Sequence, residues 1–255
     1  MSKGLTWITL RKGLEEPGCP VCNIIADGTR RSFRYFLGEG VLDPERRMRL
    51  TESNGWCLYH ALVLLTVEHR ERPDHLGSAT VYESLLEAAR RRLEEAHQRL
   101  ARPISGRSRQ RMLQEVASAL AAIRRCPVCE SEEQAEDAEA GFLVETLFHP
   151  ELGGELRELY ERSEGLCYRH LLACLRRCAG PEQAAALLDL EQPKLAALEE
   201  AVAEYARKHE YRYHHEPFGD ETDAWARAAR KLSGYRPPGT SLERLVALTR
   251  RRKAR

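Results

Sequence analysis

A doubled pattern of cysteine and histidine pairs constrains this chain more than any other feature of its sequence. Cys19-Pro20-Val21-Cys22 is followed by Cys57-Leu58-Tyr59-His60, and Cys126-Pro127-Val128-Cys129 is followed by Cys167-Tyr168-Arg169-His170. Close ligand pairs separated by two residues are typical of zinc sites. We therefore predict two Cys3His metal sites, built from Cys19, Cys22, Cys57, His60, Cys126, Cys129, Cys167 and His170.

The local sequence places these pairs at the starts of helices. Pro17-Gly18 is a turn signal, and Pro20 suits the first position of a helix because its φ is already helical and its missing N–H has no partner there. Residues three apart share one face of a helix, so Cys57 and His60 can face the same ion. A helix N-terminus also favours the thiolate over the thiol, which is the form that binds metal.

An internal repeat accompanies the doubled pattern. The interval from Cys22 to Cys57 is 35 positions and that from Cys129 to Cys167 is 38, a difference of about one helical turn. Gap-free matches pair Phe36–Glu45 with Phe142–Glu151 and Ser53–Cys57 with Ser163–Cys167. We therefore predict two related helical units in a pseudo-two-fold arrangement, each built around one Cys3His site.

We expect each copy to close its own site, with Cys19 and Cys22 joined by Cys57 and His60, although the sequence leaves open an exchange of ligands between the copies. Four protein ligands fill a tetrahedron and leave no position for a water nucleophile. The pattern therefore favours structural metal over an enzyme centre. The proposed ion is Zn²⁺, at two sites.

Composition favours an all-α fold, because Ala, Leu, Glu and Arg dominate stretches that contain few β-branched runs. Met1–Glu16 reads as a short lead-in and Ser78–Ala101 as a long amphipathic helix. Pro181 is expected to open a helix that pauses at Pro193, and Asp223–Leu232 is expected to be a helix with Trp225 buried.

We divide the chain into two helical units at a basic segment that contains Ser105-Gly106 and few apolar residues. The first metal-binding unit covers residues 1–102 and the second 111–234. Residues 103–110 are the expected linker, and 235–255 a basic C-terminal tail.

Charge and cysteine usage limit the partners and the compartment. Lys plus Arg number 40 and Asp plus Glu 39, so nothing global attracts nucleic acid or an anionic membrane. The uncharged stretch Ala61–Val67 is far shorter than the roughly 20 residues of a membrane span, and the N-terminus lacks the apolar core of a secretory signal. Eight cysteines arranged largely as metal pairs fit a reducing compartment. We predict a cytoplasmic protein with no membrane partner.

Three alternatives remain open from the sequence. Iron–sulfur clusters use similar ligands. Cys-Pro-Val-Cys also resembles a thiol redox motif, although such folds place a strand before it. Basic stretches at Arg90–Arg92, Arg102–Arg111 and Arg250–Arg255 allow nucleic-acid binding, but Glu130–Glu139 balances them and no aromatic residues interleave.

Five other candidate ligands are assigned no metal role. Cys174 and Cys178 align with Leu64 and Glu68 in the first copy, so we predict core or boundary thiols. His209, His214 and His215 lie in a polar segment, where we predict solvent-facing side chains.

Three features of the chain occur in combination. They are the paired Cys-x-x-Cys units, the Gly-x-Cys-x-x-His units Gly55-Trp56-Cys57-Leu58-Tyr59-His60 and Gly165-Leu166-Cys167-Tyr168-Arg169-His170, and the closing segment from Arg212-Tyr213 through Pro217-Phe218-Gly219 to Ala224-Trp225. This combination resembles a bacterial family of helical proteins known as domain of unknown function 6062. It covers about residues 19–234. It supports the pairing of the motifs and implies no activity. We interpret the chain as a zinc-binding module with a binding or regulatory role and a protein partner.

Overall fold

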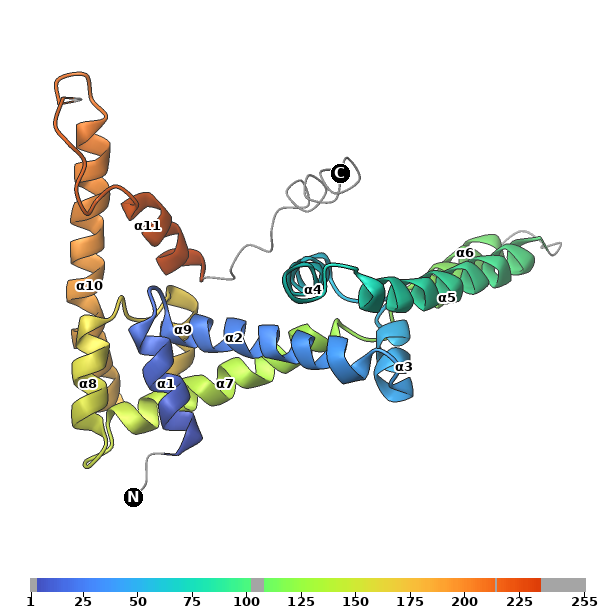
Figure 1. Cartoon of the computed structure of the whole chain (residues 1–255), viewed down its shortest axis with the longest axis horizontal. Coiled ribbons are helices and arrows are strands. Elements are labelled where there is room, and N and C mark those ends of the chain that lie inside the picture. The colour runs from blue at the N-terminus through green and yellow to red at the C-terminus, as the bar shows by residue number, and fades with distance from the viewer. Residues whose placement is uncertain (1–3, 102–107, 214, 235–255) are drawn as a thin grey trace. The chain divides into compact units, whose positions relative to one another are not determined.

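The computed structural model describes residues 4–101, 108–213 and 215–234. Within these ranges the chain forms eleven α-helices and one π-helical segment, with no strand (Figure 1). The predicted all-α fold is confirmed. Most of the expected linker, the basic tail at 235–255 and His214 lie outside the described residues.

The helices follow one another through short connections. They are, in chain order, α1 (Leu5–Glu15), α2 (Pro20–Tyr35) with its π-helical continuation (Phe36–Gly40), α3 (Pro44–Glu52), α4 (Leu58–Glu71), α5 (Leu76–Leu100), α6 (Ser108–Leu120), α7 (Pro127–Leu147), α8 (Gly153–Arg162), α9 (Tyr168–Leu175), α10 (Pro181–Lys208) and α11 (Ala224–Ser233).

The contacts group these helices into two compact units that do not follow chain order. One unit contains described residues 4–27 and 133–234 without 214, and the other contains 28–101 and 108–132. Each unit therefore combines segments from both sides of residues 103–110, unlike the linear division expected from the sequence. The boundaries fall inside α2 and α7. The pseudo-two-fold relation stays a prediction.

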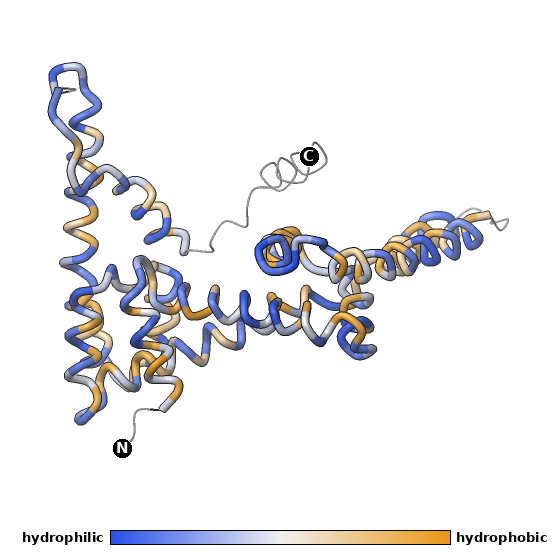
Figure 2. Tube along the Cα trace, viewed as in Figure 1, coloured by the Kyte–Doolittle hydropathy of each residue, from blue (hydrophilic) through white to orange (hydrophobic). Residues whose placement is uncertain are grey.

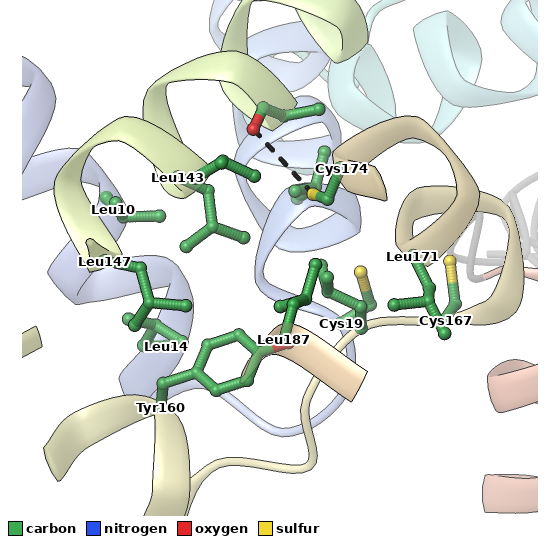
Figure 3. Packing of buried hydrophobic residues seen from close by; sticks show 14 of the residues in the cluster. Leu10, Leu14, Cys19, Leu143, Leu147, Tyr160, Cys167, Leu171, Cys174 and Leu187 are labelled. Carbon is green, nitrogen blue, oxygen red and sulfur yellow. Dashed lines mark hydrogen bonds between the residues drawn. The ribbon is translucent and has the colours of Figure 1, made fainter. Parts of the chain in front are cut away.

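The core of the first unit forms where α1, the start of α2 and α7–α10 meet. Leu143 and Leu187 are fully buried, and Tyr160 packs beside them (Figure 3). Cys19 and Cys167 belong to the same cluster, so the predicted ligands lie at the edge of an apolar core. Burial of this kind stabilises by about 25 cal/mol per Å² of apolar surface removed from water.

The core of the second unit gathers aromatic and aliphatic side chains around the start of α4. Phe33, Phe36 and Leu64 are buried there, and Trp56 forms T-shaped contacts with both phenylalanine rings. Helix α5 contacts α3, α4 and α6. Hydrophobic and hydrophilic residues alternate along the α5 tube in the way expected of an amphipathic helix (Figure 2).

The N-terminal segment is more ordered than the predicted lead-in. Leu5–Glu15 forms α1, which packs on α8 and buries Trp7, Leu10 and Leu14. These residues are spaced three and four apart, which is the signal of an amphipathic helix.

Two further expectations in the C-terminal part are wrong. Helix α10 continues through Pro193 instead of pausing there. Residues on both sides of this proline, Glu191 and Lys194, form hydrogen bonds with the turn before α9, so tertiary contacts accompany the helix through a position that disfavours it. Trp225 is 59% exposed, because α11 buries Ala224 and Lys231 on its inner face instead.

Within the described ranges, every helix is too short or too polar to span a bilayer.

Candidate metal centres

The structure brings all eight predicted ligand residues together in two groups. Cys19, Cys22, Cys167 and His170 form one group, here called the Cys19 site. Cys57, His60, Cys126 and Cys129 form the other, here called the Cys57 site. In each group one donor atom per residue lies within 4.8 Å of all the others.

The expectation that each copy closes its own site is wrong. The Cys-x-x-Cys pair of each copy meets the Cys-x-x-His pair of the other, as Cys22 with Cys167 and Cys57 with Cys129. Cys22 and Cys57 belong to different sites, as do Cys129 and Cys167. The physical reason lies in the fold: the compact units combine segments from both parts of the chain, and each site lies within one unit.

Three sulfur atoms surround one imidazole nitrogen in the Cys19 site. The Nδ1 atom of His170 lies 3.3 Å from Sγ of Cys19, 3.3 Å from Sγ of Cys22 and 3.2 Å from Sγ of Cys167. The Sγ atoms of Cys22 and Cys167 are 3.8 Å apart. All four side chains are buried.

The Cys57 site repeats this arrangement with its own residues. The Nδ1 atom of His60 lies 3.2 Å from Sγ of Cys57, 3.5 Å from Sγ of Cys126 and 3.4 Å from Sγ of Cys129. The Sγ atoms of Cys57 and Cys129 are 3.6 Å apart. In both sites Nδ1, and not Nε2, faces the sulfurs.

These distances fit a single tetrahedral ion. Bonds of about 2.3 Å to sulfur and about 2.0–2.1 Å to nitrogen place two sulfurs about 3.8 Å apart and a sulfur about 3.6 Å from the nitrogen. The observed separations lie close to these values or slightly below them. Each site could therefore hold one metal ion with little movement of its side chains.

Each Cys-x-x-Cys or Cys-x-x-His pair begins at a helix start, as predicted. Cys57 and Cys167 are the N-caps of α4 and α9, with extended backbone. Cys19 and Cys126 immediately precede the first residues of α2 and α7. In all four cases the carbonyl of the first cysteine accepts the backbone N–H four residues later. The second ligand of each pair then lies in the first turn.

Glycines shape the turns that lead into the two Cys-x-x-His pairs. Gly55 and Gly165 adopt φ values of 89° and 71°, in the left-handed region that favours glycine. A Cβ atom on Gly165 would also collide with the carboxylate of Glu191. The Gly-x-Cys spacing therefore has a steric cause at this turn.

Buried charges hold the turn that presents Cys167. The Glu191 carboxylate accepts the Leu166 N–H at 2.9 Å and the Tyr160 hydroxyl. Lys231 of α11 donates to Glu191 at 2.7 Å and to the carbonyl of Glu164 at 2.9 Å.

Lys194 of α10 supports the same turn from its other end. Its ammonium donates to the carbonyls of Tyr160, Glu161 and Ser163 at 2.7–2.8 Å. Helices α10 and α11 thus fix the backbone on which one ligand of the Cys19 site depends.

A carboxylate from α7 lies behind each histidine. Glu132 Oε1 is 3.0 Å from Nε2 of His60 and also accepts the Thr29 hydroxyl at 2.7 Å. Glu136 Oε1 is 3.8 Å from Nε2 of His170, and Arg169 pairs with the same carboxylate. Carboxylates in this position fix the tautomer of a ligating histidine and raise its basicity.

Sequence reasoning missed these two glutamates as site residues. The available signal was spacing, because Glu132 follows Cys129 by three residues and Glu136 follows Glu132 by four on one helix.

The side chains of the Cys57 site shift one another's pKa values. Burial acts to lower the pKa of His60, but its hydrogen bonds with Cys126 and Glu132 outweigh burial and raise that pKa to about 9. Burial acts to raise the pKa of Cys126, but the His60 bond lowers it to about 6. Burial and the Cys126 charge raise the pKa of Cys129 to about 12.

In the Cys19 site, too, one thiol has a lowered pKa and another a raised pKa. Hydrogen bonds from Cys19 and Cys22 lower the pKa of Cys167, whereas burial raises the pKa of Cys19 well above its ordinary value. Each site thus contains one thiol with a lowered pKa and one with a raised pKa. A divalent cation supplies the positive charge that three neighbouring thiolates require.

A cavity of about 580 Å³ in the first unit reaches the Cys19 site. Its wall includes Cys19, Cys167 and Pro193. The cavity lies between α10, α11 and the turn before α9, beside two of the four ligand residues of the Cys19 site.

The candidate ligands outside the two groups have other surroundings. Cys174 is fully buried in the apolar core and Cys178 packs against it, so the prediction of core or boundary thiols is confirmed. His209 and His215 are exposed, also as predicted.

Comparison with known families agrees with the geometry. A family model described as "Family of unknown function (DUF6062)" matches residues 1–238. The chain belongs to the DUF6062 family. No curated protein and no solved structure matches it.

For this DUF6062 protein the matched range includes both candidate sites and all eleven α-helices. The resemblance inferred from the Gly-x-Cys-x-x-His units is thereby confirmed. The family description assigns no activity, so the chemistry of the sites has to be argued from their residues.

The carboxylate behind His60 generates the first prediction. Replacing Glu132 with Gln removes its negative charge, and we expect metal affinity at the Cys57 site to fall about 10–100-fold. Chelator competition on the metal-loaded DUF6062 protein measures this change. Glu145→Gln, on an exposed position of the same helix, is the matched control. Equal affinities in the two variants would contradict a role for Glu132 at the metal.

The ion pair behind Cys167 generates the second prediction. Lys231→Met leaves Glu191 without its cation, and breaking a buried pair in this way costs about 3–5 kcal/mol. We expect metal release from the DUF6062 protein to become biphasic, with the Cys19 site releasing its ion faster and the Cys57 site unchanged.

A second lysine provides the control for this prediction. Lys208→Met breaks the Lys208–Glu221 pair, whose side chains are 12% and 10% exposed, at the far end of α10. If both lysine variants accelerate release equally, or if both sites are affected together, the turn does not control the Cys19 site.

Proposed function

We propose that this protein is a zinc-binding protein with two structural Cys3His centres, acting as a binding or regulatory module in the reducing cytoplasm. The observation that carries the proposal is the convergence of three Sγ atoms and one Nδ1 atom within 4.8 Å at each site. Zn²⁺ combines thiolate and imidazole ligands in closed structural tetrahedra of this composition.

A structural role follows from the number of ligands. Four protein side chains complete a tetrahedral shell, whereas catalytic zinc keeps one position for water or substrate. Ions bound in this way contribute to folding, because apparent zinc-binding energies are about 10–16 kcal/mol and a domain is stable by about 5–15 kcal/mol. We therefore expect each unit to depend on its ion.

An iron–sulfur cluster is the second candidate for the same residues. A cluster of several irons spreads its terminal ligands around an inorganic core. The sulfur separations of 3.6 Å and 3.8 Å favour a single ion instead. Thiol redox chemistry is the third reading, and the cavity that reaches Cys19 and Cys167 supports it for one site.

A role in binding a protein partner is supported by the surface of α5. Leu86, Leu93 and Leu100 recur every seven residues along this helix and are 69%, 58% and 42% exposed. Residues seven apart lie on nearly the same face of a helix. Apolar positions gathered on one exposed helix face are typical of interaction surfaces.

Nucleic-acid binding is less well supported. In the stretch Arg90–Arg92, Arg90 pairs with Glu94 and Arg91 with Glu87, so their charges are compensated within α5. Arg92 binds Asn54 and the carbonyl of Thr51. The three arginines therefore form contacts within the protein, which makes them less suited to binding nucleic acid.

The experiment is metal analysis of the purified protein and of two double variants. We expect about two zinc ions per chain and no visible absorption band. Cys22→Ser/Cys167→Ser removes two ligands from one site, so one ion should remain. Cys22→Ser/Cys57→Ser removes one ligand from each site, so both ions should be bound weakly.

The outcome separates the alternatives. Cys178→Ser, which changes a cysteine outside both sites, should keep two ions. Circular dichroism of each variant shows whether a lost ion reflects a lost ligand or a lost fold. A broad visible band in the starting protein would indicate an iron–sulfur cluster, and retention of one ion by Cys22→Ser/Cys57→Ser would show that each copy closes its own site.

A further inference from the structure

Two histidines outside the Cys3His sites approach each other at the end of α4. His69 lies in the last turn of α4, and His75 is the N-cap of α5. The intervening turn is fixed by backbone bonds from Arg72 N–H to the Glu68 carbonyl and from His75 N–H to the Arg72 carbonyl.

His75 has an unusual backbone conformation. Its φ of 58° is in the left-handed region, which residues other than glycine rarely adopt. Such conformations cost about 1–3 kcal/mol and cluster at functional sites.

The two rings meet through their nitrogens. Nδ1 of His69 is 3.3 Å from Nε2 of His75, whereas the ring centroids are 5.4 Å apart. Two imidazole nitrogens bound to one tetrahedral ion, with bonds of about 2.0–2.1 Å, lie about 3.3 Å apart. The pair thus already has the separation of a chelating pair.

A buried carboxylate lies close to one ring nitrogen of His75. Glu68 is fully buried; its Oε1 accepts the Ser78 N–H at 3.0 Å, and its Oε2 lies 3.6 Å from Nδ1 of His75. A carboxylate at this position favours the proton on Nδ1 and leaves the Nε2 lone pair facing His69. Ligating histidines in metal sites commonly donate their other ring N–H to a carboxylate, and Glu68 is the carboxylate placed on that side of His75.

We propose that His69 and His75 form a third metal site, for a divalent transition ion such as Zn²⁺, with Glu68 as the supporting carboxylate. Imidazole suits Zn²⁺, Cu²⁺ and Ni²⁺, whereas Mg²⁺ and Ca²⁺ prefer oxygen ligands. Both histidines are partly exposed, so water completes the coordination shell. Because only two protein side chains bind this ion, we expect it to bind more weakly and to exchange faster than the two Cys3His ions. This inference goes beyond the proposed function, because its residues lie outside both Cys3His sites.

The test is equilibrium dialysis of Zn²⁺ against the protein with both Cys3His sites loaded. We expect a third, weaker equivalent whose affinity falls at least tenfold in His69→Ala and in His75→Ala. Both variants should keep the two tight ions, which shows that the fold persists. His97→Ala, at an exposed position on α5, is the matched control and should keep all three.

The variant Glu68→Gln tests separately whether the Glu68 carboxylate supports metal binding at His75. It keeps an amide oxygen that can accept the Ser78 N–H, and we expect it to weaken only the third equivalent, by about 10–100-fold. A third equivalent unaffected by either histidine variant would overturn the proposal, as would its absence from the starting protein. The pair would then be an N–H···N hydrogen bond only. The number of tightly bound ions tests the proposed function, whereas the third, weaker equivalent tests the histidine site.

Discussion

The mutual repulsion of buried thiolates is the constraint on which the rest of this structure depends. In each unit an imidazole nitrogen lies 3.2–3.5 Å from three sulfurs, and one pair of these sulfurs is 3.6 Å or 3.8 Å apart. Burial raises the pKa of Cys19 and contributes most to the raised pKa of Cys129, so these two thiols resist ionisation. A divalent ion changes that balance, because it favours every thiolate at once. We therefore expect the packing of each unit to be coupled to metal binding.

Because the two copies exchange ligand pairs, each site joins residues that are far apart in the sequence. Cys22 and Cys167 are 145 positions apart, and Cys57 and Cys129 are 72 apart. Loops of this length cost only slightly more entropy to close than short ones, so the chain can pair distant motifs. Helix α7 contributes to both sites, since Cys129 and Glu132 serve the Cys57 site and Glu136 stands behind His170. The carboxylates lie one helical turn apart on α7.

Much of the local structure could be predicted because its causes are local. Proline and cysteine at helix starts, with a ligand three residues later, indicated both the helix boundaries and the eight converging side chains. Pairing could not be predicted in the same way, since identical motifs offer chemically equivalent partners and only tertiary packing chooses between them. Trp225 and Pro193 show the same limit. Residue type predicted that Trp225 is buried and propensity predicted a break at Pro193, but α11 buries Ala224 and Lys231 instead and α10 continues through the proline.

The most direct measurement is an anomalous difference map at the zinc edge from crystals of the full chain. The account predicts two strong peaks. One should lie about 2.3 Å from the sulfurs of Cys19, Cys22 and Cys167 and about 2.0–2.1 Å from Nδ1 of His170, and the other should lie at the same distances from Cys57, Cys126, Cys129 and His60. A peak shared by Cys22 and Cys57, or well-ordered sites without a peak, would contradict it.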